Sequence, residues 1–239
     1  SRPLVEADIS DLGVYSTATG WIPSSDTWTY ASLNSFTIAG VDRTDQFPVG
    51  TKIKLTNNGN VGYWWVATSS FSTDTTVTLA YTIERVLANS AITLPYISYA
   101  DAPQGFPQWM GFNPALPNIT QGNGSYGYNK FNITGGMLSM VVKFTFGSTS
   151  AMGTAPRIVI PAGLSIANVT FPFPAGDAWF FESVLATYEG YLWIYDGTSV
   201  NIGSPLVSAS YPYGSDLSAT VPFTWGDSDV LAIHATIPL

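Results

Sequence analysis

The sequence predicts an all-β protein with two β domains: a small N-terminal β-barrel-like module and a C-terminal β-sandwich or jelly roll. Short runs rich in Val, Ile, Thr and aromatic residues recur between Gly, Pro, Asn and Ser, and helical periodicity is almost absent. Only 10% of the residues are charged, whereas an ordinary soluble domain carries about a quarter. The 239 residues are enough for two domains, each with its own core.

In the first half, strands are predicted over residues 35–39, 52–56, 62–69 and 75–82. The second of them alternates polar and apolar residues, as a strand with one solvated face does. It is followed by Asn57-Asn-Gly-Asn60, whose residues tolerate positive φ, so a tight hairpin is predicted there. Residues 83–91 are predicted to form a short helix, because Glu84, Arg85 and Leu87 are good helix formers.

Five prolines among aromatic residues mark residues 95–117 as a linker whose rings pack against their neighbours. In the second half, strands are predicted over residues 126–133, 137–147, 157–160, 179–186, 190–196, 200–202, 206–210, 221–225 and 230–237. The predicted division is an N-terminal attachment segment (1–26), a small β module (27–94), the linker (95–117) and a C-terminal β-sandwich domain (118–239).

The charge balance argues against nucleic acid as a partner. The formal net charge is −8 and the eight Lys and Arg residues are scattered, whereas binding to phosphate needs a basic patch. No apolar run approaches the length of a membrane span, so membrane insertion is not expected. Cys is absent, which excludes disulfides and thiolate sites.

No motif for catalysis or for a cofactor is found. His234 is the single histidine and no G-x-S-x-G sequence presents a serine, so a catalytic triad and a zinc site are not expected. No phosphate-binding loop or dinucleotide motif is present. Oxygen ligands for Ca²⁺ are available, without a calcium-loop motif, from Asp42, Asp45, Asp227 and Asp229.

Paired acids are the one pattern compatible with an enzyme, because glycosidases need two carboxyl groups at a set distance. The candidate pairs are Glu182 with Glu189 and Asp227 with Asp229. Solvated acids, or acids that cap a turn, are the favoured interpretation of both pairs.

Aromatic side chains are the main candidates for contact with a ligand or partner, because flat rings stack on sugars and pack in protein interfaces. The alternation of Tyr63-Trp64-Trp65 requires at least one of its two faces to be core or subunit interface. The run Tyr191-Leu-Trp-Ile-Tyr195 favours a strand covered on both faces, with a sugar-stacking platform as the alternative. The candidate contact residues are Tyr211, Tyr213, Trp64 and Trp109.

Several short phrases, in order along the chain, resemble β modules of bacteriophage minor tail, tail-fibre and head-fibre proteins. They include Trp28-Thr-Tyr30, Phe47-Pro-Val-Gly-Thr-Lys-Ile-Lys54, Asn118-Ile-Thr-Gln-Gly-Asn-Gly124 and Val221-Pro-Phe-Thr-Trp225. The resemblance implies a non-enzymatic virion structural protein of tail-tip or fibre type, located on the exterior of the tail or capsid. It also implies a homotrimeric or otherwise symmetric component. The partners expected for such a protein are further copies of itself, other virion proteins attached through the N-terminal segment, and a host cell-surface glycan. A capsid decoration or head-fibre protein is the alternative, and a glycan-degrading enzyme is a weaker one.

Overall fold

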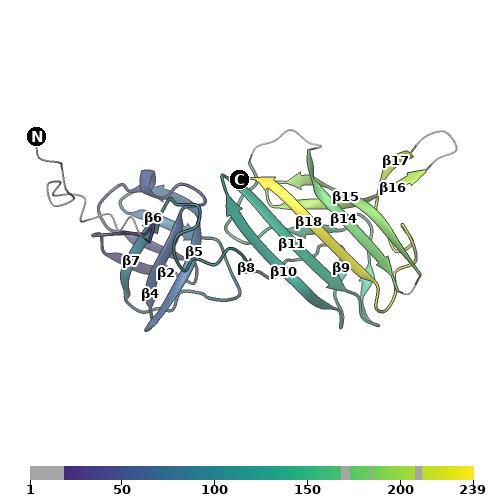
Figure 1. The fold of residues 1–239 in the computed structure, drawn as a ribbon, viewed down its shortest axis with the longest axis horizontal. Coiled ribbons are helices and arrows are strands. Elements are labelled where there is room, and N and C mark those ends of the chain that lie inside the picture. Colours follow the sequence, from purple (N-terminus) through teal and green to yellow (C-terminus); the bar gives the residue numbers. More distant parts are fainter. Residues whose placement is uncertain (1–18, 168–172, 184, 208–211) are drawn as a thin grey trace, which may run out of the picture. The chain divides into compact units, whose positions relative to one another are not determined.

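The structure is a computed structural model that describes residues 19–167, 173–183, 185–207 and 212–239 (Figure 1). The described residues form two compact units: unit 1 contains those of residues 19–81 and 85–108, and unit 2 contains those of residues 82–84 and 109–239 that the structure describes. More than half of the chain is strand, and the described residues contain no α-helix. The predicted all-β fold class is therefore confirmed.

Unit 1 is one seven-stranded antiparallel sheet with the strand order β1-β7-β4-β5-β6-β3-β2. Its strands are β1 (Ile22–Pro23), β2 (Trp28–Ser32), β3 (Ser35–Ile38), β4 (Lys52–Asn57), β5 (Asn60–Phe71), β6 (Thr75–Leu79) and β7 (Ile92–Ser98). A single 3₁₀ turn, Thr44–Gln46, lies between β3 and β4. The predicted hairpin joins β4 to β5, and both of its turn residues have positive φ, 50° at Asn58 and 73° at Gly59.

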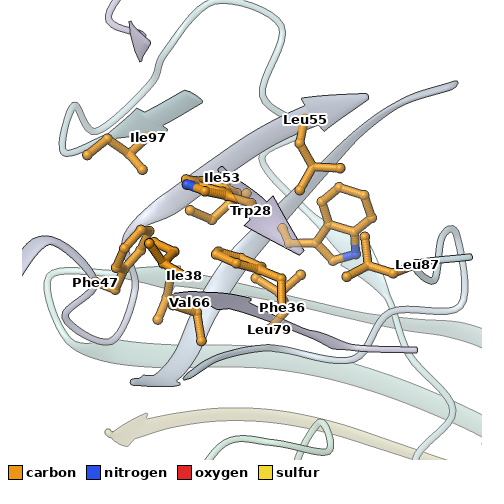
Figure 2. Packing of buried hydrophobic residues seen from close by; sticks show 12 residues of the cluster. Trp28, Phe36, Ile38, Phe47, Ile53, Leu55, Val66, Leu79, Leu87 and Ile97 are labelled. Carbon is orange, nitrogen blue, oxygen red and sulfur yellow. The ribbon is translucent and has the colours of Figure 1, made fainter. Parts of the chain in front are cut away.

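The core of unit 1 is built around stacked rings (Figure 2). Trp28 of β2 and Phe36 of β3 lie parallel, with centroids 4.2 Å apart, and Phe47 meets both rings edge-on. Ile53 of β4 and Ile97 of β7 close the same cluster from the other strands. Because alternate residues of strands across the whole sheet point into one core, the sheet curls around it, as a barrel-like module requires.

The helix predicted over residues 83–91 is wrong, because tertiary contacts override its local helix propensity. The N–H of Ile83 donates to the carbonyl of Gly111 in unit 2. The side chain of Leu87 is buried in the core of unit 1, and its N–H donates to the carbonyl of Leu33. The N–H of Ala88 donates to Oδ1 of Asn57 at 2.7 Å. These donors have partners elsewhere, so no ladder of i to i−4 hydrogen bonds forms.

Two predicted segment boundaries fall inside the sheet of unit 1. Strand β7 crosses the predicted boundary between residues 94 and 95. Pro95 lies where the register between β4 and β7 shifts, so its missing N–H costs no hydrogen bond between the two strands. Leu94 has a φ of 49° at this irregularity. In the segment predicted for attachment, Ile22 of β1 pairs with Ile97, so residues after 18 belong partly to the sheet. Residues 1–18 lie outside the described residues.

Unit 2 contains a nine-stranded sheet with the order β13-β16-β15-β14-β18-β11-β10-β8, in which β17 also pairs with β16, and a two-stranded sheet of β9 and β12. Its strands are β8 (Met110–Gly111), β9 (Ile119–Thr120), β10 (Ser125–Thr134), β11 (Met137–Thr145), β12 (Ala151–Met152), β13 (Arg157–Val159), β14 (Pro174–Glu182), β15 (Ala186–Asp196), β16 (Ser199–Val207), β17 (Pro212–Asp216) and β18 (Val230–Pro238). Every pairing in it is antiparallel.

Alternation along these strands separates a buried inner face from an outer face. In β18, Leu231 and Ile233 are buried and point inward, whereas His234 is exposed on the outer face. The strand predicted over residues 221–225 is wrong. Pro222 has no N–H for a ladder, and Trp225 folds back so that its N–H donates to the carbonyl of Ala219.

Alkaline unfolding tests the surroundings of Tyr126, whose hydroxyl donates to the carbonyl of Pro114 at 2.7 Å. Burial raises the pKa of Tyr126 to about 12, against about 10 in an unfolded chain. Because this pKa is higher in the folded protein than in the unfolded chain, the contribution of the neutral phenol to the free energy of unfolding is fully present below about pH 10. It is lost as the pH rises toward about 12. Between these pH values, we expect Tyr126→Phe to lose less stability than the wild type in urea denaturation. Parallel pH profiles of the two proteins would contradict this assignment.

Candidate functional site

Of the four predicted contact residues, the structure describes the exposure of two, Trp109 and Trp64. Trp109 is half-buried in unit 2. Tyr213 is in β17, where its backbone is opposite Leu206 of β16. Tyr211 lies outside the described residues. Trp64 is 2% exposed in the core of unit 1, so its prediction as a contact residue is wrong.

The burial of Trp64 follows from the alternation along β5. Trp64 points into the core, and its indole N–H donates to the carbonyl of Arg85 at 3.2 Å. Trp65 points to the opposite face, where Phe106 covers it with ring centroids 5.0 Å apart. Both faces of the Tyr63-Trp64-Trp65 run are therefore packed within unit 1, which confirms that this run could not leave both faces in solvent.

The two candidate acid pairs are not brought together as hydrolysis requires. Glu189 is opposite Trp179 in the register of β14 and β15, and Glu182 is three residues further along β14. An odd spacing places these two carboxylates on opposite faces of the sheet. On its own face, Glu182 accepts a hydrogen bond from the hydroxyl of Tyr188 at 3.1 Å, which raises the pKa of that tyrosine.

The second pair divides into an exposed and a buried acid. Asp227 is exposed, whereas Asp229 is 4% exposed and accepts hydrogen bonds from the N–H groups of Ser183 and Gly226, at 2.8 and 2.6 Å. A carboxylate that caps backbone donors in this way is a structural group. Asp42, another acid considered as a calcium ligand, likewise caps a turn by accepting from the N–H and hydroxyl of Thr44, which lowers its pKa.

Among the described residues, no three His, Asp or Glu side chains gather where a metal ion could bind. His234 is exposed on the outer face of the nine-stranded sheet. No helix in the described ranges is long and apolar enough to cross a membrane.

The outer face of unit 2 carries an open cavity of about 630 Å³ that is lined by residues of β14, β15 and β17. This volume lies within the range of small-molecule sites, about 300–1,000 Å³. The cavity combines two rings with two carboxylates. Its lining residues are Pro174, Gly176, Asp177, Tyr191, Leu192, Trp193, Gly214, Ser215 and Asp216.

Two glycines on neighbouring strands leave space for the rings of this cavity. A Cβ at Gly203 of β16 would lie 2.5 Å from Cζ3 of Trp193, and a Cβ at Gly214 of β17 would overlap the hydroxyl of Tyr191. Both rings therefore extend from β15 over the neighbouring strands instead of standing upright between side chains. Their centroids are 5.2 Å apart and their planes are tilted by 30°. The result is a broad aromatic surface that faces the cavity from one side.

The two acids of the cavity flank these rings. Asp177 of β14 is opposite Tyr191, Tyr191 is opposite Gly203, and Gly203 is opposite Asp216. Directly paired residues share a face, so this row crosses the cavity. Three strand spacings separate the Cα atoms of the two acids by roughly 14 Å, with Tyr191 and Gly203 between them in the row. The two acids can therefore contact opposite sides of a molecule bound over the rings.

Tyr191 keeps its proton in this setting. Burial and the charge of Asp216 raise the pKa of Tyr191, against a smaller opposing effect of the backbone N–H of Ser215. The neutral phenol is a hydrogen-bond donor as well as an acceptor. No Lys or Arg is among the lining residues of the cavity that the structure describes, and the nearest basic side chain in the register is His234 of β18, which is opposite Asp177 on the same face.

The interpretation of residues 191–195 as a strand covered on both faces is wrong. Leu192 and Ile194 are buried on the inner face, but Tyr195 is 49% exposed and the other two rings border the cavity. Sequence reasoning did not find Asp177 and Asp216, because their proximity to the rings depends on strand pairing. The ring at every second position was the available signal.

Comparisons with known proteins give no relative from which a role for these residues could be taken. No protein-family model, curated protein or solved structure matches the chain significantly. The chemistry of the cavity therefore follows from its own residues.

Proposed function

We propose that the chain is a non-enzymatic structural protein of a bacteriophage virion, of the tail-tip or fibre type, that adheres to the host surface. The observation that carries the proposal is the open cavity on the outer face of unit 2, where rings and carboxylates are displayed on paired strands. The low charge content and the phrases that resemble phage β modules support it. A binding site held in place by paired strands loses little conformational entropy when its ligand binds.

Assembly as a homotrimer, with the N-terminal segment attached to other virion proteins, belongs to the same proposal. Several copies would present several cavities to one surface, and linked sites bind more strongly than single ones.

Immunogold electron microscopy on particles of the phage that encodes the chain tests this proposal. We expect an antiserum against the chain to label the tail tip or fibres, and the label to disappear when the serum is first absorbed with purified protein. A label on the head would replace the tail-tip proposal with the capsid decoration or head-fibre alternative. Complete particles without label, at a titre that labels the purified chain, would contradict a place in the virion.

The weaker alternative, a glycan-degrading enzyme, has its own test. Because Glu182 and Glu189 lie on opposite faces of the sheet, we expect no reducing sugar to be released from host envelope polysaccharide. Release that Glu182→Gln abolishes would contradict the non-enzymatic proposal.

A further inference from the structure

We propose that the cavity over β14, β15 and β17 binds an uncharged saccharide, whose ring stacks on Trp193 and Tyr191 while its hydroxyl groups donate to Asp177 and Asp216. The inference rests on the proposed adhesive function and names the class of ligand that this site recognises.

The first argument is the form of the aromatic surface. A pyranose ring has an apolar face of C–H groups that packs against a flat ring, and its hydroxyl groups project around its edge. Trp193 and Tyr191 come from one face of one strand, and Gly203 and Gly214 let them extend over the sheet. An organic cation is bound best by several rings that surround it. Rings on one side, with acids at the edge, match a sugar better than a cation.

The second argument is charge. Asp177 and Asp216 are both exposed carboxylates, which accept hydrogen bonds and donate none. Saccharide hydroxyls are suitable donors, and hydrogen bonds to a charged acceptor are stronger than those between neutral groups. Sialic acids, uronic acids and phosphorylated sugars would bring a negative charge toward one or the other of these acids. The cavity therefore selects uncharged saccharides.

The third argument is rigidity. Every side chain in the proposal lies on a strand that pairs with its neighbour, and the register runs from Asp177 through Tyr191 and Gly203 to Asp216. The bulge between Pro174 and Gly176 sets this register. Bulges occur often next to functional sites, where they change the direction of a side chain. The bound saccharide would find its contacts already in place.

The experiment uses the purified full chain and a glycan array. The array carries neutral oligosaccharides of glucose, galactose, mannose, rhamnose and N-acetylhexosamines, with sialylated, uronic and phosphorylated glycans for comparison. The neutral glycan that is retained most strongly is then titrated against the wild type and three variants, Trp193→Ala, Asp177→Asn and Asp216→Asn. Choline is titrated as the cationic probe.

We expect binding to a subset of neutral glycans and to none of the anionic ones. Trp193→Ala should weaken binding at least about tenfold, and each Asp→Asn change several-fold. The matched control is Tyr195→Ala, which removes a ring from the same strand and face, outside the cavity, where it contacts Arg157. Its affinity should stay within about twofold. The Asn variants keep side-chain size at exposed positions, so they report on binding even if Trp193→Ala does not fold.

The proposal is overturned if no neutral glycan binds, if anionic glycans or choline bind instead, or if the cavity variants bind as the Tyr195→Ala control does. Virion labelling is independent of these outcomes. A labelled tail with no saccharide binding would reject this inference and leave the proposed function standing. Saccharide binding without labelled particles would reject the place in the virion and leave the saccharide site standing.

Discussion

Replacing Phe36 by alanine is expected to lower the free energy of unfolding of unit 1 by about 3–5 kcal/mol. Phe36 is completely buried, stacks on Trp28 at 4.2 Å and meets Phe47 edge-on. Alanine would remove these contacts and leave a cavity in a core formed by one curled sheet. Since a domain is stable by only about 5–15 kcal/mol, this loss is a large share of the total. Urea denaturation followed by near-ultraviolet circular dichroism measures it.

The matched control for this change is Leu33→Ala. Leu33 lies between β2 and β3, close in sequence to Phe36, but it is 56% exposed. A surface substitution of this kind changes stability by about 0.5 kcal/mol or less. If Phe36→Ala unfolded at the same urea concentration as Leu33→Ala, the ring stack would not be the centre of the unit 1 core.

Replacing Gly176 by alanine is expected to destabilise unit 2 by more than about 3 kcal/mol and to abolish binding in the cavity. Gly176 has a φ of 143°, where residues with a side chain are strained. A Cβ there would also overlap the carbonyl oxygen of His234 in the neighbouring strand β18 and lie 2.9 Å from Cα of Ala235. Strand β14 would have to move away from β18, and Asp177 would move with it. Thermal unfolding and glycan titration measure the two effects.

Gly127→Ala is the matched control in the same unit. Gly127 also lies at a register shift, between Tyr126 and Tyr128 of β10, but a Cβ there would meet only the side chain of Lys143, at 3.5 Å. Alanine should be neutral or should raise stability by up to about 1 kcal/mol. Equal destabilisation by the two substitutions would mean that the bulge in β14 does not need its glycine.

The sequence was most informative where local pattern and tertiary structure agree. The polar–apolar alternation around Lys52–Asn57 and the Asn58-Gly59 turn specify strand, hairpin and buried face together, and the structure has all three. It was least informative where contacts with residues far away in the sequence determine the local structure. Residues 83–91 have helix-forming side chains, yet Leu87 is held by the core of unit 1.

Proline was a poor guide for a related reason. The sequence predicts that a linker begins at Pro95, but a shift in register lets β7 continue through this residue. Pro222 lies in a run rich in β-forming residues, and there the chain turns. In both places, the position of the missing N–H relative to a neighbouring strand decides the outcome, and one sequence does not show that neighbour.

The cavity was only half visible in the sequence. The rings of Tyr191 and Trp193 appear in the alternation of their strand, whereas Asp177 and Asp216 stand 14 residues before and 25 residues after Tyr191. Their relation to the rings depends on a bulge in β14 and on the pairing of β16 with β17. Gly203 and Gly214 carry no signal in the sequence, because the rings that extend over them come from another strand.

The central claim is that unit 2 binds the saccharides of a host surface through the rings of its cavity and does not cleave them. The most direct measurement is the binding of fluorescently labelled full chain to host cell envelopes, with the wild type and Trp193→Ala compared at equal concentrations. The account predicts saturable binding by the wild type and a loss of at least about tenfold in the variant. Absence of binding by the wild type, or equal binding by both proteins, would contradict it.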